Sequence, residues 1–104
     1  MKHFNKLTPA ELERLGLLSE ELGEAQQIIG KILRHGYQSY NPFDEHLTTN
    51  KALLEKELGD IQYAIKMMLE GGDINDYSIA KHAEQKAISV IPWLHHQDER
   101  VDND

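Results

Sequence analysis

The segment Ser-Glu-Glu-Leu-Gly-Glu at residues 19–24 organises the chain, and Lys-Glu-Leu-Gly-Asp at residues 56–60 repeats its Glu-Leu-Gly-acid pattern. Residues three or four apart lie on one face of an α-helix, so Glu21 and Glu24 point together, as do the two acids of the second segment. Like charges placed this way destabilise an isolated helix by about 0.2–0.5 kcal/mol per pair. Because a bound cation would offset this repulsion, we predict that the two segments are the halves of one metal site on two packed helices.

The first acidic segment lies within a predicted long helix. Thr8 as N-cap, Pro9 at the first helical position and Glu11 three residues after the cap are typical of a helix start. Apolar residues then recur at steps of three and four to about Arg34. Gly36 supplies a C-terminal stop. One amphipathic helix is expected over this stretch.

Glycines interrupt this helix at Gly16, Gly23 and Gly30, and each costs about 0.8–1.0 kcal/mol relative to Ala in a helix interior. Their seven-residue spacing keeps them near one stripe, which favours the close approach of another backbone. Gly23 and Gly59, which lie inside the two acidic segments, are therefore expected where the two helices touch. The alternative is that Gly16 divides the segment into two shorter helices.

Two further helices are expected beyond a loop. Residues 35–50 contain turn-forming residues and no sustained periodicity, which predicts a loop. Apolar spacing predicts a second helix over about residues 50–70. Asp73 or Asn75 is expected to cap a third helix, which Pro92 should end or kink.

These elements predict an all-α fold, a helical bundle of about three to four helices. The second helix carries more apolar surface than one packing partner would cover, which favours completion of the bundle by a homodimer or homotetramer. The length of 104 residues indicates a single domain. We expect that domain over residues 1–97 and an acidic, disordered tail over residues 98–104.

Composition excludes several classes of protein. The chain has no cysteine, so disulfides, thiol nucleophiles and cysteine-ligated zinc are excluded. No stretch approaches the roughly 18 apolar residues of a membrane span, and the first residues do not resemble a signal peptide. We therefore expect a soluble, cytoplasmic protein. The net charge of −7 disfavours binding to a nucleic-acid polymer and suits a divalent cation that in turn binds phosphates.

Carboxylates on two facing helices predict a hard, all-oxygen site, which suits Mg²⁺, with Mn²⁺ as the alternative. A di-iron bundle site would use Glu-x-x-His, and no Glu in this chain is followed by His three residues later. Mg²⁺ commonly takes substrate phosphate oxygens as further ligands. The site therefore predicts phosphoanhydride or phosphodiester chemistry.

These residues resemble the signature of the MazG-like all-α nucleoside triphosphate pyrophosphohydrolases, a superfamily that includes the dimeric dUTPases and the phosphoribosyl-ATP pyrophosphohydrolases. The resemblance covers residues 15–68. It is carried by Glu-Glu-x-x-Glu at 20–24, Lys-x-x-Arg-x-Gly at 31–36 and Glu-Leu-Gly-Asp at 57–60. It implies Mg²⁺-dependent cleavage of a nucleotide between its α and β phosphates, giving a nucleoside monophosphate and pyrophosphate.

The resemblance also implies roles for individual acids. Matched by position, the metal ligands would be Glu21, Glu24, Glu57 and Asp60. Glu20 would be a further ligand or would orient the attacking water. Glu20 and Glu21 are therefore the candidate catalytic residues.

Candidate substrate contacts follow the first acidic segment along the chain. They are Lys31, Arg34, Tyr37, Tyr40 and Lys81. Arg can bind two phosphate oxygens at once, although both cations of the first helix would also suit the negative end of its dipole. The two tyrosines would stack on a base or ribose, or would anchor the loop on the core. The resemblance implies a basic residue on the third helix, for which Lys86 is the alternative to Lys81.

Two other functions compete with hydrolysis. The first is a non-catalytic module that senses a nucleotide or Mg²⁺, which would bind without turnover. The second is a purely structural helical interaction protein, in which the acids only repel one another.

Overall fold

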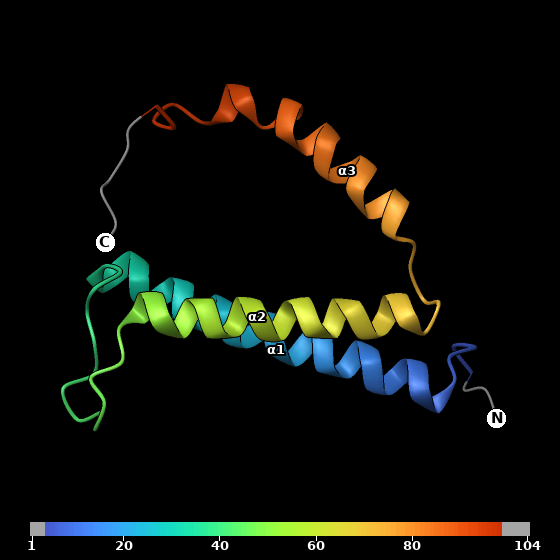
Figure 1. Ribbon diagram of the computed structural model, residues 1–104, viewed down its shortest axis with the longest axis horizontal. Coiled ribbons are helices and arrows are strands. Elements are labelled where there is room, and N and C mark those ends of the chain that lie inside the picture. Colours follow the sequence, from blue (N-terminus) through green and yellow to red (C-terminus); the bar gives the residue numbers. More distant parts are fainter. Residues whose placement is uncertain (1–3, 99–104) are drawn as a thin grey trace. The chain divides into compact units, whose positions relative to one another are not determined.

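The computed structural model describes residues 4–98 of the 104-residue chain, and these residues are helical with connecting loops. The elements in chain order are α1 (Pro9–His35), α2 (Asn50–Glu70), α3 (Asp76–Ser89) and the short 3₁₀ helix η1 (Ile91–Trp93) (Figure 1). The prediction of an all-α fold is confirmed. Among these residues, β-type pairing is limited to an isolated antiparallel bridge between Tyr40 and Thr49.

The start of α1 is fixed by a capping box. The Glu11 N–H donates to Thr8 Oγ1 at 3.1 Å, and the Thr8 N–H donates to Glu11 Oε1 at 2.7 Å. The helix continues without a break through Gly16, so the alternative of two shorter helices is wrong. It ends at Gly36, which has a φ of 89° and donates its N–H to the Ile32 carbonyl at 2.7 Å.

Side-chain caps also begin the other two helices where the sequence predicted. Thr49 Oγ1 accepts the Ala52 N–H at 3.2 Å at the start of α2. Of the two residues expected to cap α3, Asn75 is the N-cap, because its Oδ1 accepts the Ser78 N–H at 2.9 Å. Pro92 lies in η1, just beyond the end of α3, as expected of a residue that cannot continue a helix.

α1 and α2 lie side by side as an antiparallel hairpin (Figure 1). The buried apolar residues of this hairpin are Ala25 on α1 and Ala64 and Met68 on α2, with Ala64 fully inaccessible to solvent. Small side chains at the contact let two helix backbones approach closely. The alanines therefore set the separation of the two helices.

The prediction that Gly23 and Gly59 form the close contact between the helices is wrong. Both glycines are exposed, and a Cβ added to either would meet no atom within 4 Å. Gly23 precedes Ala25 by two residues, which on a helix turns it about 200° away from the face that Ala25 presents to α2. The glycines accordingly lie on the outer surface of the hairpin.

An ion pair closes the hairpin at the end opposite its loop. The Arg14 guanidinium donates to both oxygens of Asp73, at 2.6 and 2.9 Å. This hydrogen bonding lowers the pKa of Asp73 and raises that of Arg14. Gly71 makes room for the guanidinium, because a Cβ there would lie 2.6 Å from Arg14 Cζ.

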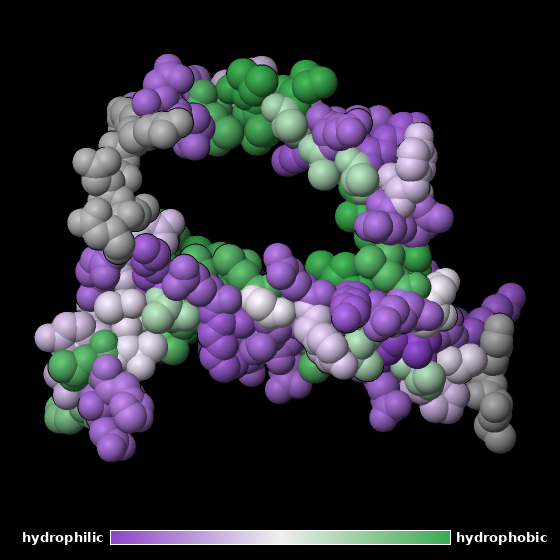
Figure 2. Space-filling view, in the orientation of Figure 1, coloured by the Kyte–Doolittle hydropathy of each residue, from purple (hydrophilic) through white to green (hydrophobic). Residues whose placement is uncertain are grey.

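Apolar surface remains uncovered along the hairpin. Figure 2 shows hydrophobic residues gathered along one edge of the α1–α2 pair and hydrophilic residues along the other. Four side chains of the predicted apolar stripe of the first helix are 40–49 % exposed: Leu12, Leu15, Leu22 and Ile29. The stripe is therefore wider than α2 alone covers.

The chain divides into two compact units, Met1–Ile74 and Asn75–Asp104. The first contains the hairpin and its loop, and the second contains α3 and η1. No described residue of the second unit is buried, and Tyr77, Ile88 and Trp93 are 73–80 % exposed. The described part of this unit therefore has no apolar core of its own.

The domain bounds proposed from the sequence stay predictions. The single domain was expected over residues 1–97 and the tail over 98–104, of which residues 99–104 lie outside the described part. No helix of the described chain is both long enough and apolar enough to cross a membrane.

Candidate metal centre and adjoining pocket

Three acids from the two helices meet inside the hairpin. One carboxylate oxygen from each of Glu21, Glu57 and Asp60 lies within 4.8 Å of the other two. Glu57 is buried, with 9 % of its surface exposed, and the other two are half-buried. The three-residue spacing of Glu57 and Asp60 puts both on the face of α2 that meets α1. The two acidic segments thus come together as the sequence predicted.

Two oxygens of this cluster are buried without a partner. Oε2 of Glu21 and Oε2 of Glu57 accept no hydrogen bond from the described residues. A buried carboxylate oxygen without a donor is costly in free energy. A hard divalent cation held by these carboxylates would supply the partner that they lack, so the residues present fit such an ion.

Burial and mutual repulsion raise the pKa of the acids on α1. The pKa of Glu21 rises to about 7, first because of burial, then through the charges of Glu24 and Asp60. The pKa of Glu24 also rises, first through hydrogen bonding with the Glu57 carboxyl, then through the charge of Glu57 and burial. Without a metal, the cluster therefore retains a proton close to neutral pH.

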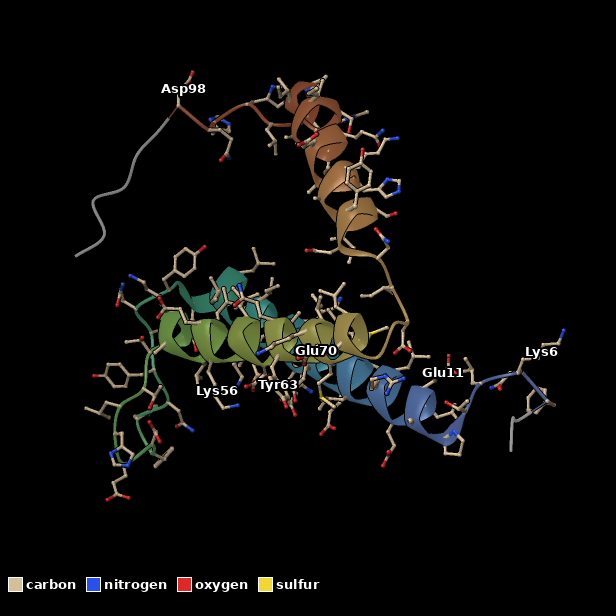
Figure 3. The ribbon with its side chains drawn as sticks, turned by 45° about the vertical axis from the view of Figure 1, so that its right-hand side comes forward. Lys6, Glu11, Lys56, Tyr63, Glu70 and Asp98 are labelled. Carbon is tan, nitrogen blue, oxygen red and sulfur yellow. The ribbon has the colours of Figure 1, made fainter. Side chains whose placement is uncertain are left out.

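A lysine lies against the cluster. Lys56 Nζ donates to Asp60 Oδ2 at 2.8 Å and lies 3.5 Å from Glu57 Oε1. This hydrogen bond is the main reason that the pKa of Asp60 is lowered and that of Lys56 is raised. Figure 3 shows the Lys56 side chain projecting from α2. Lys56 was not among the site residues predicted from the sequence, although its spacing of four from Asp60 is typical of a helical ion pair.

The remaining two predicted acids lie at the margin of the cluster. Glu24 is next to Glu57 but is not one of the three acids whose oxygens converge. Glu20 is exposed, and its charge contributes to the raised pKa of Glu24. Glu20 is thus near enough to act on the cluster from its solvent side.

A pocket of about 590 Å³ lies between the end of α1, the connecting loop and the start of α2. It is lined by Lys31, Arg34, His35, Ser39, Tyr40, Asn41, Pro42, Asp44, Thr48, Asn50 and Leu53. The structure thus brings three of the five predicted substrate contacts into one cavity. Tyr37 is not among the lining residues, and its carbonyl accepts the Lys51 N–H at 2.9 Å.

The loop that forms the pocket is held by hydrogen bonds to the start of α2. The Asn50 N–H donates to the Ser39 carbonyl at 2.8 Å, and Asn50 Nδ2 donates to the Gly36 carbonyl at 3.2 Å. Within the loop, the Thr48 N–H donates to Asp44 Oδ2 at 2.7 Å. The sequence predicted a loop here, but nothing in its periodicity indicated these contacts.

Lys81, the fifth predicted substrate contact, lies in α3 and is exposed, as is the alternative Lys86. α3 belongs to the second unit of the chain. The role of either lysine stays a prediction.

Comparison with known proteins finds no match to a family model, to a curated protein or to a solved structure. The resemblance to the MazG-like superfamily therefore rests on the residues of this chain.

Proposed function

We propose that the protein hydrolyses a nucleotide between its α and β phosphates in a Mg²⁺-dependent reaction, giving a nucleoside monophosphate and pyrophosphate. The observation that carries this proposal is the convergence of Glu21, Glu57 and Asp60 within 4.8 Å, two of them with buried, unpartnered oxygens. An all-oxygen site of this kind suits Mg²⁺, or Mn²⁺ in its place. Glu24, next to Glu57, is the fourth ligand of the proposed site.

A bound Mg²⁺ would supply charge neutralisation at the phosphate oxygens and a lowered pKa for a bound water. The protein's own residues would hold the ion and the attacking water in position. Glu21, Glu57 and Asp60 would bind the ion from two helices that the Arg14–Asp73 pair holds together. Glu20, on the solvent side, orients the attacking water or serves as a further ligand.

The pocket supports the substrate assignment. Lys31 and Arg34 line it from α1, and Tyr40 lines it from the loop. Cations and an aromatic ring in one cavity suit a nucleotide, which carries both negative charge and a planar base. The net charge of −7 argues against a nucleic-acid polymer as the partner.

We further propose a homodimer or homotetramer. Leu15, Leu22 and Ile29 recur every seven residues on α1 and are each 40–49 % exposed. A second copy of the hairpin would cover this strip and complete a four-helix bundle.

The test is to incubate the purified chain with Mg²⁺ and a panel of nucleoside triphosphates and to measure pyrophosphate and nucleoside monophosphate. We expect both products in equal amounts, and none in EDTA. Asp60→Asn should weaken metal binding by at least about tenfold, the lower bound for disturbing even the outer ligands of a metal site. Glu55→Gln, an exposed acid of α2 outside the cluster, is the matched control.

Orthophosphate as the only product, or no turnover of any nucleotide, would count against hydrolysis at this bond. Nucleotide or Mg²⁺ binding without turnover would instead support the sensing module.

A further inference from the structure

The pocket and the acid cluster lie along one seam between α1 and α2. Lys31 follows Glu24 by seven residues, and Asn50 precedes Glu57 by seven. Seven residues make nearly two helical turns, so each pair shares a helix face and is separated by about 10 Å of rise. Leu53, which also lines the pocket, precedes Glu57 by only four residues, so the pocket begins about 6 Å of rise from the acids and extends along the same seam. Phosphates bound through a metal at the acids would leave the rest of the nucleotide to extend toward it.

The cations of the pocket are not engaged by the protein's acids. Neither Lys31 nor Arg34 forms a salt bridge with a described residue, whereas Arg14 and Lys56 both do. An acidic chain of net charge −7 thus leaves two cations facing a cavity of ligand size. Both are available to a bound molecule.

The N-terminal amides of α2, which also border the pocket, are already used. The Asn50 and Lys51 N–H groups donate to loop carbonyls, and the Ala52 N–H donates to Thr49 Oγ1. The helix N-terminus therefore offers no free donors to an anion. A ligand in this pocket would therefore be bound by side chains and not by the backbone amides of α2.

The lining side chains offer both kinds of hydrogen-bonding partner. Arg34 and Lys31 are donors only, while the Asp44 carboxylate accepts and does not donate when ionised. The Thr48 N–H, which donates to Asp44 Oδ2 at 2.7 Å, lowers the pKa of Asp44 and keeps it ionised. Tyr40 and Leu53 supply apolar surface for a planar ring.

We propose that this pocket binds the base and sugar of a guanine nucleotide, with Arg34 and Lys31 at the acceptor edge of the base and Asp44 at its donor edge. Guanine presents two adjacent acceptors, O6 and N7, which the planar guanidinium of Arg binds with two parallel hydrogen bonds. On another edge it presents the N1–H and N2–H₂ donors that a carboxylate accepts. Adenine, cytosine and uracil lack this combination. The orientation of the base rests on the proposed function, which puts the phosphates at the acids, and it assigns Arg34 and Lys31 to the base in place of the phosphate contact expected from the sequence.

The test is calorimetric titration of the full chain, in EDTA, with guanosine, adenosine, cytidine and uridine. Nucleosides carry no phosphate, so the measurement reports the pocket without the metal site. We expect guanosine to bind at least about tenfold more tightly than the other three, within the discrimination of a bidentate contact. Inosine, which lacks the N2 amine, should lose part of that advantage.

Variants separate base recognition from general attraction of anions. Arg34→Lys keeps the positive charge and loses the two parallel N–H donors of the guanidinium, so it should reduce the preference for guanosine about tenfold. Asp44→Asn should weaken guanosine more than inosine. Lys66→Gln, an exposed cation of α2 outside the pocket, is the control.

Equal affinity for the four nucleosides, or displacement of guanosine by inorganic phosphate, would overturn the proposal. Pyrophosphate release from all triphosphates without base preference would overturn it too, and would leave the proposed hydrolysis standing. Guanosine binding by a chain that hydrolyses no triphosphate would support the pocket assignment and refute the hydrolysis.

Discussion

The Lys56 ammonium lies 2.8 Å from Oδ2 of Asp60, so a side chain of the protein already contacts an acid that a metal ion would bind. It also lies 3.5 Å from Oε1 of Glu57. A metal ion must compete with this cation for two of the three converging acids. Lys56 would therefore lower the affinity of the proposed metal site.

We predict that Lys56→Gln binds Mn²⁺ more tightly than the unmodified chain, by up to about fivefold, the factor that corresponds to an exposed ion pair. The free Mn²⁺ signal in electron paramagnetic resonance measures the dissociation constant directly. Lys66→Gln removes the same charge from the same helix away from the acids, so it controls for net charge. Equal affinities of the two variants would show that Lys56 does not compete with the ion.

The metal-free protein should become less stable as the pH rises from about 5 to about 7. The pKa of Glu21 is raised to about 7 in the folded chain from an ordinary value of 4.5. The folded state therefore binds more protons than the unfolded state in this window, and its free energy of unfolding falls with increasing pH. Urea unfolding followed by circular dichroism in EDTA would measure the change.

Glu21→Gln should reduce this dependence, because the variant has no proton to lose at that position and only Glu24, whose pKa is also raised, still contributes in the same direction. Asp44, Asp60 and Asp73 do not interfere, since their pKa values are lowered and their contributions are lost only in more acidic solution. Mg²⁺ should stabilise the chain more at pH 8 than at pH 6, because it displaces the proton. A urea midpoint that falls equally in both proteins between pH 5 and 7 would contradict the assignment.

Gly71→Ala should destabilise the hairpin, because its Cβ would lie 2.6 Å from Arg14 Cζ and displace the guanidinium from Asp73. Gly23→Ala is the matched control: its Cβ meets nothing within 4 Å, and Ala in a helix interior should stabilise the fold by about 0.8–1.0 kcal/mol. Urea unfolding compares the two. In an Arg14→Met background the cost of Gly71→Ala should disappear, and its persistence would locate the strain elsewhere.

Leu22→Lys should shift the protein toward the monomer, because Leu22 lies on the exposed apolar strip and is 49 % exposed in the single chain. Burying a lysine in an interface core is unfavourable. Gln27→Lys adds the same charge at another exposed position of α1 and should leave the assembly intact. Light scattering after size-exclusion chromatography gives the mass of each. A monomeric unmodified chain would refute the proposed oligomer.

The sequence predicted the helices because their boundaries depend on local chemistry. Thr8, Thr49 and Asn75 act as caps through hydrogen bonds to backbone amides only three residues away. The apolar spacing between caps and stops then fixed the extent of each helix. The pairing of the two acidic segments was also predictable, because each segment holds its acids on one helix face.

The contacts between helices were not predictable in the same way. Gly23 and Gly59 were expected at the interface because of their small size, and they lie on its outside. Which of several small residues meets the partner helix depends on the rotation of the helix, which the apolar spacing alone did not determine. Burial of Ala25 and Ala64 resolved that choice.

The sequence by itself determined an all-α chain with capped helices and two acidic faces, because hydrogen bonds and periodicity within a few residues are sufficient for that. Tertiary structure alone decided that Glu21, Glu57 and Asp60 converge while Glu24 lies beside them. It alone brought Asp44 into the pocket with Arg34. These relationships depend on the register and rotation of two helices and on the path of their loop, which are set by packing across the hairpin.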